Sequence, residues 1–466
     1  MINILKHTAR RAPASGSTPF KLVARTQAEE DAYNYVEHRV VEKPSGVVGS
    51  VAHIVKGALG AGVLSGHVAY KTGGVVVGIV VNLLCAIYMT YCLYILVKAA
   101  QVLYRRCRVP TMTYPDVGEA ACAVSTSPKV TKFAKTFRYI IDVLICIDLF
   151  GSCAAYQIII AKSIKQLVEN VPKTSFEGAN GLPGLRVYLA CMIVPLMLIC
   201  LIRHLKWLAP LSIVANLVVL LCLFVAIYYA FEYNPSFTGM VPYTTPYEIV
   251  QFIGMSVFSM SCVCVVIPIE NNMKDPKKYG LTLTTGMLLI FTGVSSISFF
   301  GYAGFLEESE SPITVNFPLN TTGKILKACI AVMIYVTHAL NFWVPFNTVF
   351  VYLQKRHNPQ KILLWEMFYR VLFVFIIAVT AITFPTITAL IGFLGAFCLT
   401  NLGFIFPNII HLLVIWERPG LGPYKWRLWL ALAMIVVGSF LGICGTAVSL
   451  VELLKVAFSA GQRSDL

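Results

Sequence analysis

The chain has 466 residues, of which 57% are hydrophobic and only 13% are charged, and its mean hydropathy is +0.74. Soluble domains carry about 25% charged residues, so the composition excludes a soluble domain and predicts a polytopic protein of the lipid bilayer. The net charge of +15 is expected to reflect basic loops at the membrane surface, so no nucleic-acid partner is predicted.

The 14 cysteines lie mostly in apolar runs, where cysteine behaves as a small core residue. No Cys-x-x-Cys pair has zinc spacing, so we predict neither a metal site nor a disulfide framework. The sequence shows no ring of acids and no Ser/His/Asp set, so neither a channel nor an enzyme is expected.

Residues 1–46 precede the first apolar stretch. They are polar and mixed in charge, as in "RTQAEEDAYNYVEHRVVEKPSG", and hold no apolar run long enough for a signal peptide. We therefore predict a disordered cytosolic tail over 1–46, a single transmembrane domain over 47–456 and a short C-terminal tail over 457–466.

Eleven apolar stretches have the length of a membrane helix. A hydrocarbon core of roughly 30 Å needs about 20 apolar residues, and this is met at 47–70, 74–103, 137–165, 186–202, 207–231, 248–272, 281–306, 324–353, 362–384, 387–415 and 428–456. The predicted fold is an all-α polytopic membrane protein with 11 transmembrane helices. Most lysines and arginines fall in loops that lie inside when the N-terminus is cytosolic, which sets that orientation.

The sequon Asn320-Thr321-Thr322 lies in the loop after the seventh stretch, which this orientation places outside the cell or in a lumen. We predict glycosylation at Asn320, although such triplets also arise by chance. The odd number of helices places the two termini on opposite sides of the membrane.

The first stretch contains "HIVKGALGAGVL", with Gly57, Gly60, Ala61 and Gly62 at mid-membrane. Glycine is the least helix-favouring residue after proline, and non-helical backbone at this depth survives only where it lines a cavity or is buried in protein. We predict a break that exposes N–H groups at the positive pole of the second half-helix, which suits a carboxylate. The alternative is that the glycines only permit close helix packing.

The sixth stretch is interrupted too, since "SMSCVCVVIPIENNMKDPKK" places Pro268 inside the span and Glu270 after it. The first and sixth helices begin two five-helix halves, 47–231 and 248–415, with 428–456 as an extra helix. Matched breaks of this kind point to a transporter binding site. Carbonyls freed by the second break would accept from an ammonium group, so the pair predicts a receptor for an α-amino acid.

His53 lies in the first half-helix, and Lys56 follows at i+3 on roughly the same face. Histidine is the side chain whose unperturbed pKa lies near physiological pH, so His53 is the predicted group for proton coupling. The alternative is a buried histidine bonded to a neighbouring helix. Asp142 and Asp148 in the third stretch are isolated acids that would face a cavity or the cytosolic mouth.

At these residues the chain resembles the proton-coupled amino acid transporters of the amino acid/auxin permease branch of the amino acid–polyamine–organocation superfamily, as an insect-like divergent member. The resemblance runs from about Gly46 to Lys455 and rests on "HIVKGALGAGVL", "IRHLKWLAPLSIVAN", "VIPIENNMKDPKKYG", "GYAGFLEESESPITVNFP" and "THALNFWVPFNTV". It implies the 5+5 inverted-repeat fold typified by LeuT, a cytosolic N-terminus and transport of small neutral amino acids.

The resemblance also implies roles for single residues. The position of His53 is tied to proton coupling, and Gly60–Gly62 matches the unwound substrate loop. Glu270 and Asn272 match a Pro-x-Glu-Asn-x-Met run, in which Glu270 alternatively holds the cytosolic end of the sixth helix. The predicted substrate-binding residues are Gly57, Gly60, Ala61, Gly62, Ser261, Cys262 and Cys264. The predicted structural or gating residues are Lys56, Pro268, Glu270 and Asn272.

The sixth helix departs from the family's usual step, which is close to Phe-Glu-Gly-Ile-Gly. Here the segment reads "MSCVC", so Ser261 replaces the acid and Cys262 and Cys264 replace the glycines. Losing the glycines stiffens the break, and losing the acid removes a proton or ammonium partner. The first helix departs as well, with "LSGHVA" where a Leu-Pro-like step is usual, and "ENVPKTSFEGANGLPG" lacks the expected cysteine.

These patterns predict secondary active transport of small neutral amino acids by alternating access, with a proton as coupling ion and no other cofactor. The alternative is a non-transporting amino acid sensor or signalling scaffold of the lysosomal membrane, with a signalling partner on the cytosolic tail. We expect an integral multi-pass protein of the plasma membrane or of the lysosomal or late endosomal membrane.

Overall fold

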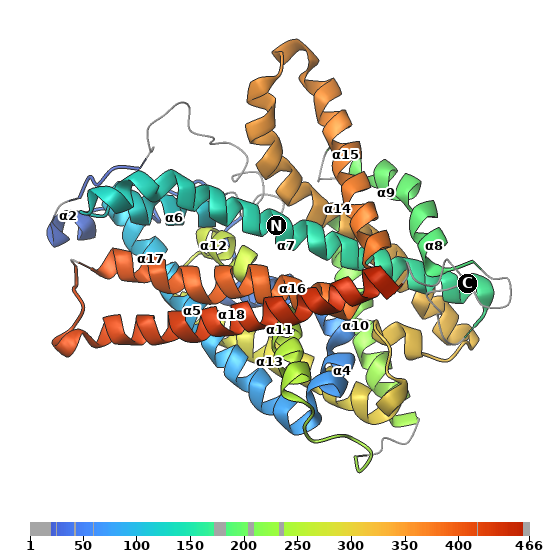
Figure 1. The fold of residues 1–466 in the computed structure, drawn as a ribbon. Helices are drawn as coiled ribbons and strands as arrows, with labels where there is room; N and C mark the ends of the chain where they lie inside the picture. The colour runs from blue at the N-terminus through green and yellow to red at the C-terminus, as the bar shows by residue number, and fades with distance from the viewer. Residues whose placement is uncertain are drawn as a thin grey trace.

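The computed structural model describes residues 20–24, 26–41, 43–58, 60–171, 183–203, 209–232, 237–416 and 418–459. Parts of the two predicted tails, 1–19 and 460–466, lie outside this portion of the chain. The described residues form a bundle of α-helices without a β-strand, as predicted (Figure 1).

Helices occupy all eleven predicted apolar stretches. In chain order they are α3 (Val47–Ala58) and α4 (Ala61–Gly73), α5 (Val75–Cys107), α7 (Pro128–Glu169), α8 (Leu185–Cys191) and α9 (Ile193–Cys200), α10 (Ala209–Glu232), α11 (Pro246–Met260) and α12 (Val263–Asn272), α13 (Tyr279–Phe305), α14 (Thr321–Leu353), α15 (Ile362–Thr383), α16 (Ile387–Phe393) and α17 (Phe406–Ile415), and α18 (Trp426–Ser459). Two further helices, α2 (Gln27–Asp31) and α6 (Tyr114–Ala123), lie between or before the apolar stretches.

Eight of the described helical segments are long and apolar enough to cross a membrane, and the bent pair α3–α4 raises the number to nine. Leu185–Cys200 is a shorter apolar helical segment, and α10 extends over 24 residues. The chain is therefore a polytopic membrane protein, whereas eleven crossings and the 5+5 repeat stay predictions.

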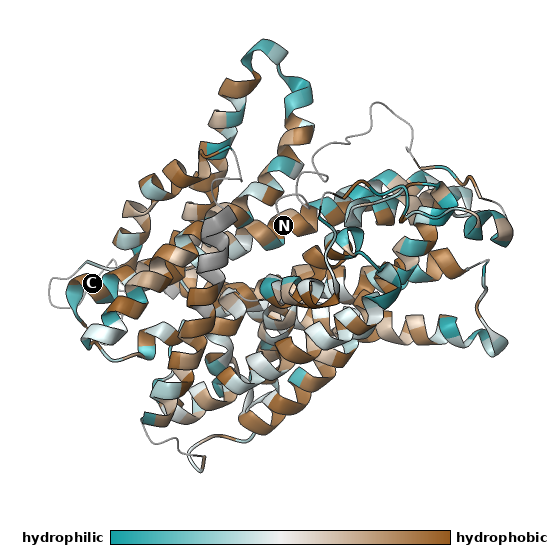
Figure 2. Ribbon diagram, turned by 180° about the vertical axis from the view of Figure 1, so that it is seen from behind, coloured by the Kyte–Doolittle hydropathy of each residue, from teal (hydrophilic) through white to brown (hydrophobic). Residues whose placement is uncertain are grey.

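Apolar side chains are exposed along the outside of the bundle, as expected of a surface that meets lipid. Leu84 on α5, Phe375 on α15 and Phe440 on α18 are among them. Figure 2 shows that hydrophobic residues dominate the helices, while hydrophilic residues gather around α2 and α6 and at the turn between α14 and α15.

Both predicted breaks are present. α3 ends at Ala58 and α4 begins at Ala61, and the two helices are bent by 59°. α11 ends at Met260, because Ser261 adopts extended backbone with φ −74° and ψ 129°, and α12 begins at Val263. The second break therefore falls within the "MSCVC" segment.

Pro268 does not interrupt the sixth stretch, which corrects that part of the prediction. It lies inside α12, in the second turn of the helix. A proline in a helix lacks the N–H that would bond the carbonyl four residues earlier, which here belongs to Cys264. The loss falls in the first turn of α12, where the helix is already open at the break, so the helix continues through the proline.

The stretch from Ile387 to Ile415 is not α-helical throughout. α16 and α17 are joined by two π-helical segments, η7 (Leu394–Leu399) and η8 (Asn401–Ile405). π-Helical turns are rare and occur frequently at functional sites. A Cβ added to Gly254 of α11 would lie 2.5 Å from the carbonyl oxygen of Gly392, so the backbones of α11 and α16 are in contact just before η7.

The described part of the N-terminal segment 1–46 differs from the predicted disorder. α2 packs on α5, and the carboxylate of Glu30 forms a buried ion pair with the guanidinium of Arg106, with Oε1 and Nε 2.9 Å apart. Local composition predicts disorder because the segment holds few apolar residues. The cationic partner lies 76 residues further along the chain, where a local rule does not detect it.

Candidate functional site

A cavity of about 150 Å³ lies where the two broken helices meet, with α7, α14 and η7 completing its wall. The lining contains all the predicted substrate-binding residues, namely Gly57, Gly60, Ala61, Gly62, Ser261, Cys262 and Cys264. Lys56 lines the cavity too, whereas His53, Pro268, Glu270 and Asn272 do not. The structure thus brings the predicted binding residues of the two breaks together and places most of the predicted gating residues elsewhere.

The start of α4 presents backbone donors to this cavity. Gly60 is the N-cap residue and has no side chain to cap the first turn, so the N–H groups of Ala61 and Gly62 have no partner within the helix. The helix dipole adds partial positive charge at the same end. This arrangement suits a carboxylate group.

Two of the glycines also let the broken helices touch each other. A Cβ on Gly62 would lie 2.6 Å from Cα of Ser259 in α11, and a Cβ on Gly57 would lie 2.7 Å from Cγ2 of Val265 in α12. Close packing, the alternative explanation of these glycines, therefore applies to both residues in addition to their place in the cavity wall.

α7 lines the cavity with three polar side chains that the predicted site did not include. Asp148, Ser152 and Tyr156 follow one another at i, i+4 and i+8, on one helix face. A Cβ on Gly60 would lie 2.7 Å from the Tyr156 hydroxyl oxygen, so this side chain reaches the break. The spacing is visible in the sequence, but it does not by itself tell which face of the helix lines a cavity.

The rest of the wall comes from α14 and the π-helical segment. α14 contributes Thr337, Leu340 and Asn341, and η7 contributes Leu399. Together with Val265, the two leucines give the cavity an apolar part beside its polar groups.

His53 lies on α3, is half-buried and stays outside the cavity lining. Its imidazole forms no hydrogen bond with the residues that the structure describes, so the bond to a neighbouring helix that the alternative interpretation requires is not seen there. The role of His53 in proton coupling stays a prediction.

Glu270 is fully buried near the end of α12, and two side chains hold its carboxylate. Nη2 of Arg39 lies 2.9 Å from Oε2, and Nε2 of Gln101 donates to Oε1 at 3.0 Å. The Arg39 guanidinium also lies 4.8 Å from the ring centroid of Tyr35. These contacts agree with the alternative in which Glu270 holds the end of the sixth helix.

Asn272 joins the end of α12 to the segment that precedes α3. Its Nδ2 donates to the carbonyl of Pro268 at 2.8 Å, and its own carbonyl accepts from the N–H of Ser45 at 2.8 Å. The carbonyl of Ser45 in turn accepts from the N–H of Lys274 at 2.9 Å. The two interrupted helices are thus tied together at the predicted cytosolic end of the bundle.

Asn320 is exposed and is the N-cap residue of α14. Its Oδ1 accepts from the N–H of Gly323 at 2.7 Å. This bond uses the oxygen of the side-chain amide, so the amide nitrogen that would carry a glycan does not take part in the cap.

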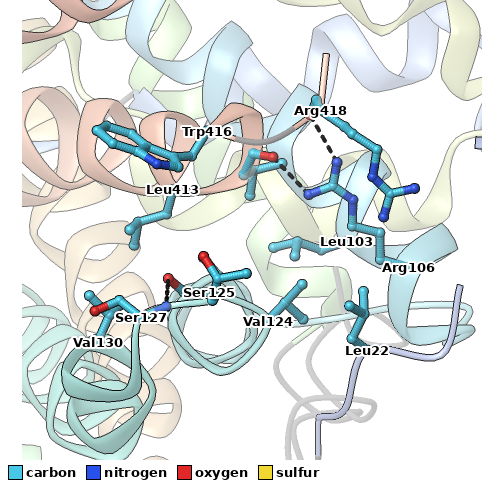
Figure 3. Close-up of a pocket in the computed structure, with 13 residues that line it drawn as sticks. Leu22, Leu103, Arg106, Val124, Ser125, Ser127, Val130, Leu413, Trp416 and Arg418 are labelled. Atoms are coloured by element: carbon cyan, nitrogen blue, oxygen red, sulfur yellow. Dashed lines mark hydrogen bonds between the residues drawn. The ribbon is translucent and has the colours of Figure 1, made fainter. Parts of the chain in front are cut away.

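A second cavity, of about 270 Å³, lies between the N-terminal segment, α5, α6 and α17 (Figure 3). Both of its cationic side chains, Arg106 and Arg418, have an oxygen of Glu30 within 3.3 Å. Arg106 also donates to the carbonyls of Val414 and Arg418. Because these charges are already matched, the cavity at the helix breaks is the better candidate. The described residues contain no cluster of three or more His, Cys, Asp or Glu side chains that would hold a metal ion.

The fold and this cavity define the class of protein. Two interrupted helices that meet at a small cavity, inside a bundle with at least eight membrane-length helical segments, are the architecture of a membrane transport protein.

Comparison with known proteins identifies the family. Residues 43–451 match the family described as "Transmembrane amino acid transporter protein", and the chain belongs to this family. It is 30% identical over 476 residues to the "Proton-coupled amino acid transporter-like protein pathetic" of Drosophila melanogaster, with 98% of each chain covered. It is 26% identical over 418 residues to "Amino acid transporter AVT3B" of Arabidopsis thaliana, with 87% of this chain and 93% of the relative covered.

Among solved structures, the chain is similar to the inward-facing conformation of Mhp1, with a TM-score of 0.54 and 13% sequence identity. The similarity covers 95% of this chain and 96% of that one, and it shows a shared fold. The family resemblance found in the sequence is confirmed. The prediction that the chain is not an enzyme is confirmed too, because the family and these relatives are transporters.

Proposed function

We propose that this protein is a secondary active transporter, which couples the movement of small neutral amino acids to that of protons by alternating access. The family supports amino acids as the substrate class. The observation that carries the proposal is the cavity between the two breaks. Its volume of about 150 Å³ is well below the roughly 300–1,000 Å³ of pockets for drug-sized ligands, which favours a small side chain.

Each part of an amino acid finds a suitable partner in this cavity. The carboxylate binds the N–H groups in the first turn of α4, which lack a partner within the helix. The ammonium group lies near the carbonyl of Cys264, which Pro268 leaves without its usual helical donor. The side chain packs against the apolar part of the wall, at Leu340 and Leu399.

A proton gradient supplies the driving force in this proposal. His53, the group that the sequence predicts for proton coupling, lies outside the cavity lining, so its imidazole does not touch a substrate bound there. The N-terminus is cytosolic, and the protein works in the plasma membrane or in the lysosomal or late endosomal membrane.

Uptake by proteoliposomes that contain the purified protein tests the proposal. Labelled alanine, glycine and proline are supplied with and without an inward-directed pH gradient, and protein-free liposomes serve as the control. We expect uptake of at least one of the three that increases with the gradient. If no uptake is seen under either condition, the transport function is contradicted. If uptake does not depend on the pH gradient, only proton coupling is contradicted.

The alternative of a sensor or signalling scaffold has no observation in its favour. It requires a tail that is free to hold a signalling partner. Two charged residues of the described tail, Glu30 and Arg39, are instead buried in ion pairs with α5 and α12.

A further inference from the structure

Asp148 differs from every other buried carboxylate in the described part of the chain. Five other buried carboxylates each have an arginine nitrogen within 3.8 Å: Glu30, Glu119, Asp142, Glu270 and Glu366. Asp148 is 5% exposed, forms no ion pair with any described residue, and its Oδ1 has no hydrogen-bond partner there. It is a buried acid without a counter-charge, and it lines the central cavity.

The groups around Asp148 do not supply that counter-charge. The titratable side chains near it or in the same cavity wall are Lys56 of α3, Tyr156 of α7, Cys262 and Cys264 of the second break, and Cys398 of η7. Lys56 has an interaction of its own, and no ion pair between Lys56 and Asp148 is found among the described residues. α14 contributes only uncharged side chains, and α15 and α16, which also pack on α7, contribute none to the cavity.

An ionised carboxylate at the position of Asp148 is energetically unfavourable. Burying a charge in the middle of a bilayer protein costs several kcal/mol unless the charge is paired or neutralised by a proton. In addition, the substrate carboxylate at the start of α4 would share a cavity of about 150 Å³ with Asp148. Two like charges in so small a space disfavour each other, so a proton on Asp148 makes room for the amino acid.

On the basis of the proposed function, we propose that Asp148, and not His53, takes up the coupling proton. The proton binds to the Asp148 carboxylate and turns it into a neutral carboxylic acid. The zwitterion then binds beside it with its carboxylate at α4, and both leave on the other side. Repulsion between the two carboxylates thus links amino acid and proton movement.

The variant Asp148→Asn tests this assignment, because an amide has the shape of the protonated acid and cannot release a proton. In proteoliposomes we expect Asp148→Asn to keep exchange of labelled for unlabelled alanine, which needs no gradient. We expect it to lose at least tenfold of the accumulation driven by a pH gradient, together with the alanine-dependent acidification that a trapped pH dye reports. The matched variant His53→Gln is expected to keep both.

The outcomes separate the assignment from the proposed function. Gradient-driven accumulation by Asp148→Asn at the wild-type level overturns the role of Asp148. Loss of proton movement in His53→Gln, with Asp148→Asn still coupled, assigns the proton to His53 and also overturns it. Wild-type protein that shows neither uptake nor exchange contradicts the proposed function itself.

A test on the wild-type protein covers the case in which Asp148→Asn does not fold. Dicyclohexylcarbodiimide reacts with protonated carboxyl groups in apolar surroundings, and mass spectrometry locates the label. We expect labelling of Asp148 that rises as the pH falls, while Glu270, paired with Arg39, stays unlabelled. Asp148 that stays unlabelled in acid overturns the assignment.

Discussion

Arg39 and Glu270 lie 231 residues apart in the sequence, yet their side chains are 3% and 0% exposed and meet in one buried pair. The arginine also donates to the backbone carbonyls of Pro110 and Glu270. Its guanidinium thus joins the N-terminal segment, the chain after α5 and the end of α12. A buried pair of this kind adds little over an apolar substitute, but the removal of one partner leaves the other charge uncompensated.

We therefore expect Arg39→Ala to destabilise the protein by about 3–5 kcal/mol, seen as a lower thermal unfolding temperature in detergent. The double variant Arg39→Ala/Glu270→Gln should recover part of the loss, because the unpaired charge is gone. Arg105→Ala is the control: its pair with Asp31 is 32% and 58% exposed, so about 1 kcal/mol or less is expected. Equal losses in Arg39→Ala and Arg105→Ala would contradict this account of the pair.

At the scale of single residues, sequence patterns located the cavity better than its charges. The glycine run stands out because glycine is the least helix-favouring residue after proline. The "MSCVC" segment stands out because it departs from the family's usual step, and both segments contribute to the cavity wall. Asp148 is visible in the sequence as an isolated acid. That no cationic side chain pairs with it among the described residues becomes clear only from the folded chain. Arg39 looks like part of a disordered tail, because its partner Glu270 is close only in the folded chain.

Among the elements, the crossing of α4 over α11 depends on Gly62. A Cβ at this position would lie 2.6 Å from a backbone atom, Cα of Ser259. A backbone atom cannot move aside by rotation about a side-chain bond, so an added methyl group separates the two helices next to the cavity.

We expect Gly62→Ala to lower stability by about 1–3 kcal/mol through overpacking and to reduce amino acid uptake. Thermal unfolding and proteoliposome uptake measure the two effects. Gly293→Ala on α13 is the matched control, since Gly293 is exposed and no atom lies within 4 Å of the added Cβ. Alanine favours a helix over glycine by roughly 1 kcal/mol, so this control should be neutral or slightly stabilising. Uptake by Gly62→Ala equal to that of Gly293→Ala would refute the close contact.

Hydropathy placed the elements well because a span is defined by about 20 apolar residues, and every predicted stretch contains a helix. Their internal geometry was less predictable. Pro268 suggested a break, but its missing N–H coincides with a turn that is already open. The π-helical turns η7 and η8 have no composition of their own, so hydropathy does not distinguish them from α-helix.

For the whole molecule, the sequence predicts the orientation of the chain in the membrane, and glycosylation at Asn320 can test this orientation. Asn320 is exposed at the start of α14, and its helix cap leaves the amide nitrogen unused. If the loop faces a lumen or the outside, a glycan can be attached without loss of the cap.

We expect the protein made in animal cells to migrate faster on a gel after endoglycosidase treatment. Thr322→Ala, which removes the sequon and keeps the Asn320 cap, should migrate like the treated protein. Asn320→Asp should do the same, because aspartate is also a good N-cap. If endoglycosidase treatment does not change the migration of the wild-type protein, the sequon no longer supports this orientation.

The number of membrane crossings shows the limit of the sequence at this scale. Eight helical segments meet the length and hydropathy of a span, and the bent pair makes a ninth. Leu185–Cys200 is apolar but short, so hydropathy suggests a crossing there that length alone does not support. The family was easier to predict than the number of membrane crossings. Motifs such as "PIENNMKDPKK" depend on particular residues, whereas a predicted crossing depends on the summed hydropathy of a stretch.

The π-helical turns in η7 and η8 determine where the chain tolerates the deletion of a residue. A π turn is closed by an i→i+5 hydrogen bond, so it holds one residue more than an α turn. Deleting one residue within Leu394–Leu399 lets η7 rewind as ordinary α-helix while the helix on either side of it keeps its facing. The same deletion ahead of Asp148 in α7 rotates everything before it by about 100° relative to the acid, and α7 has no spare residue to absorb the turn.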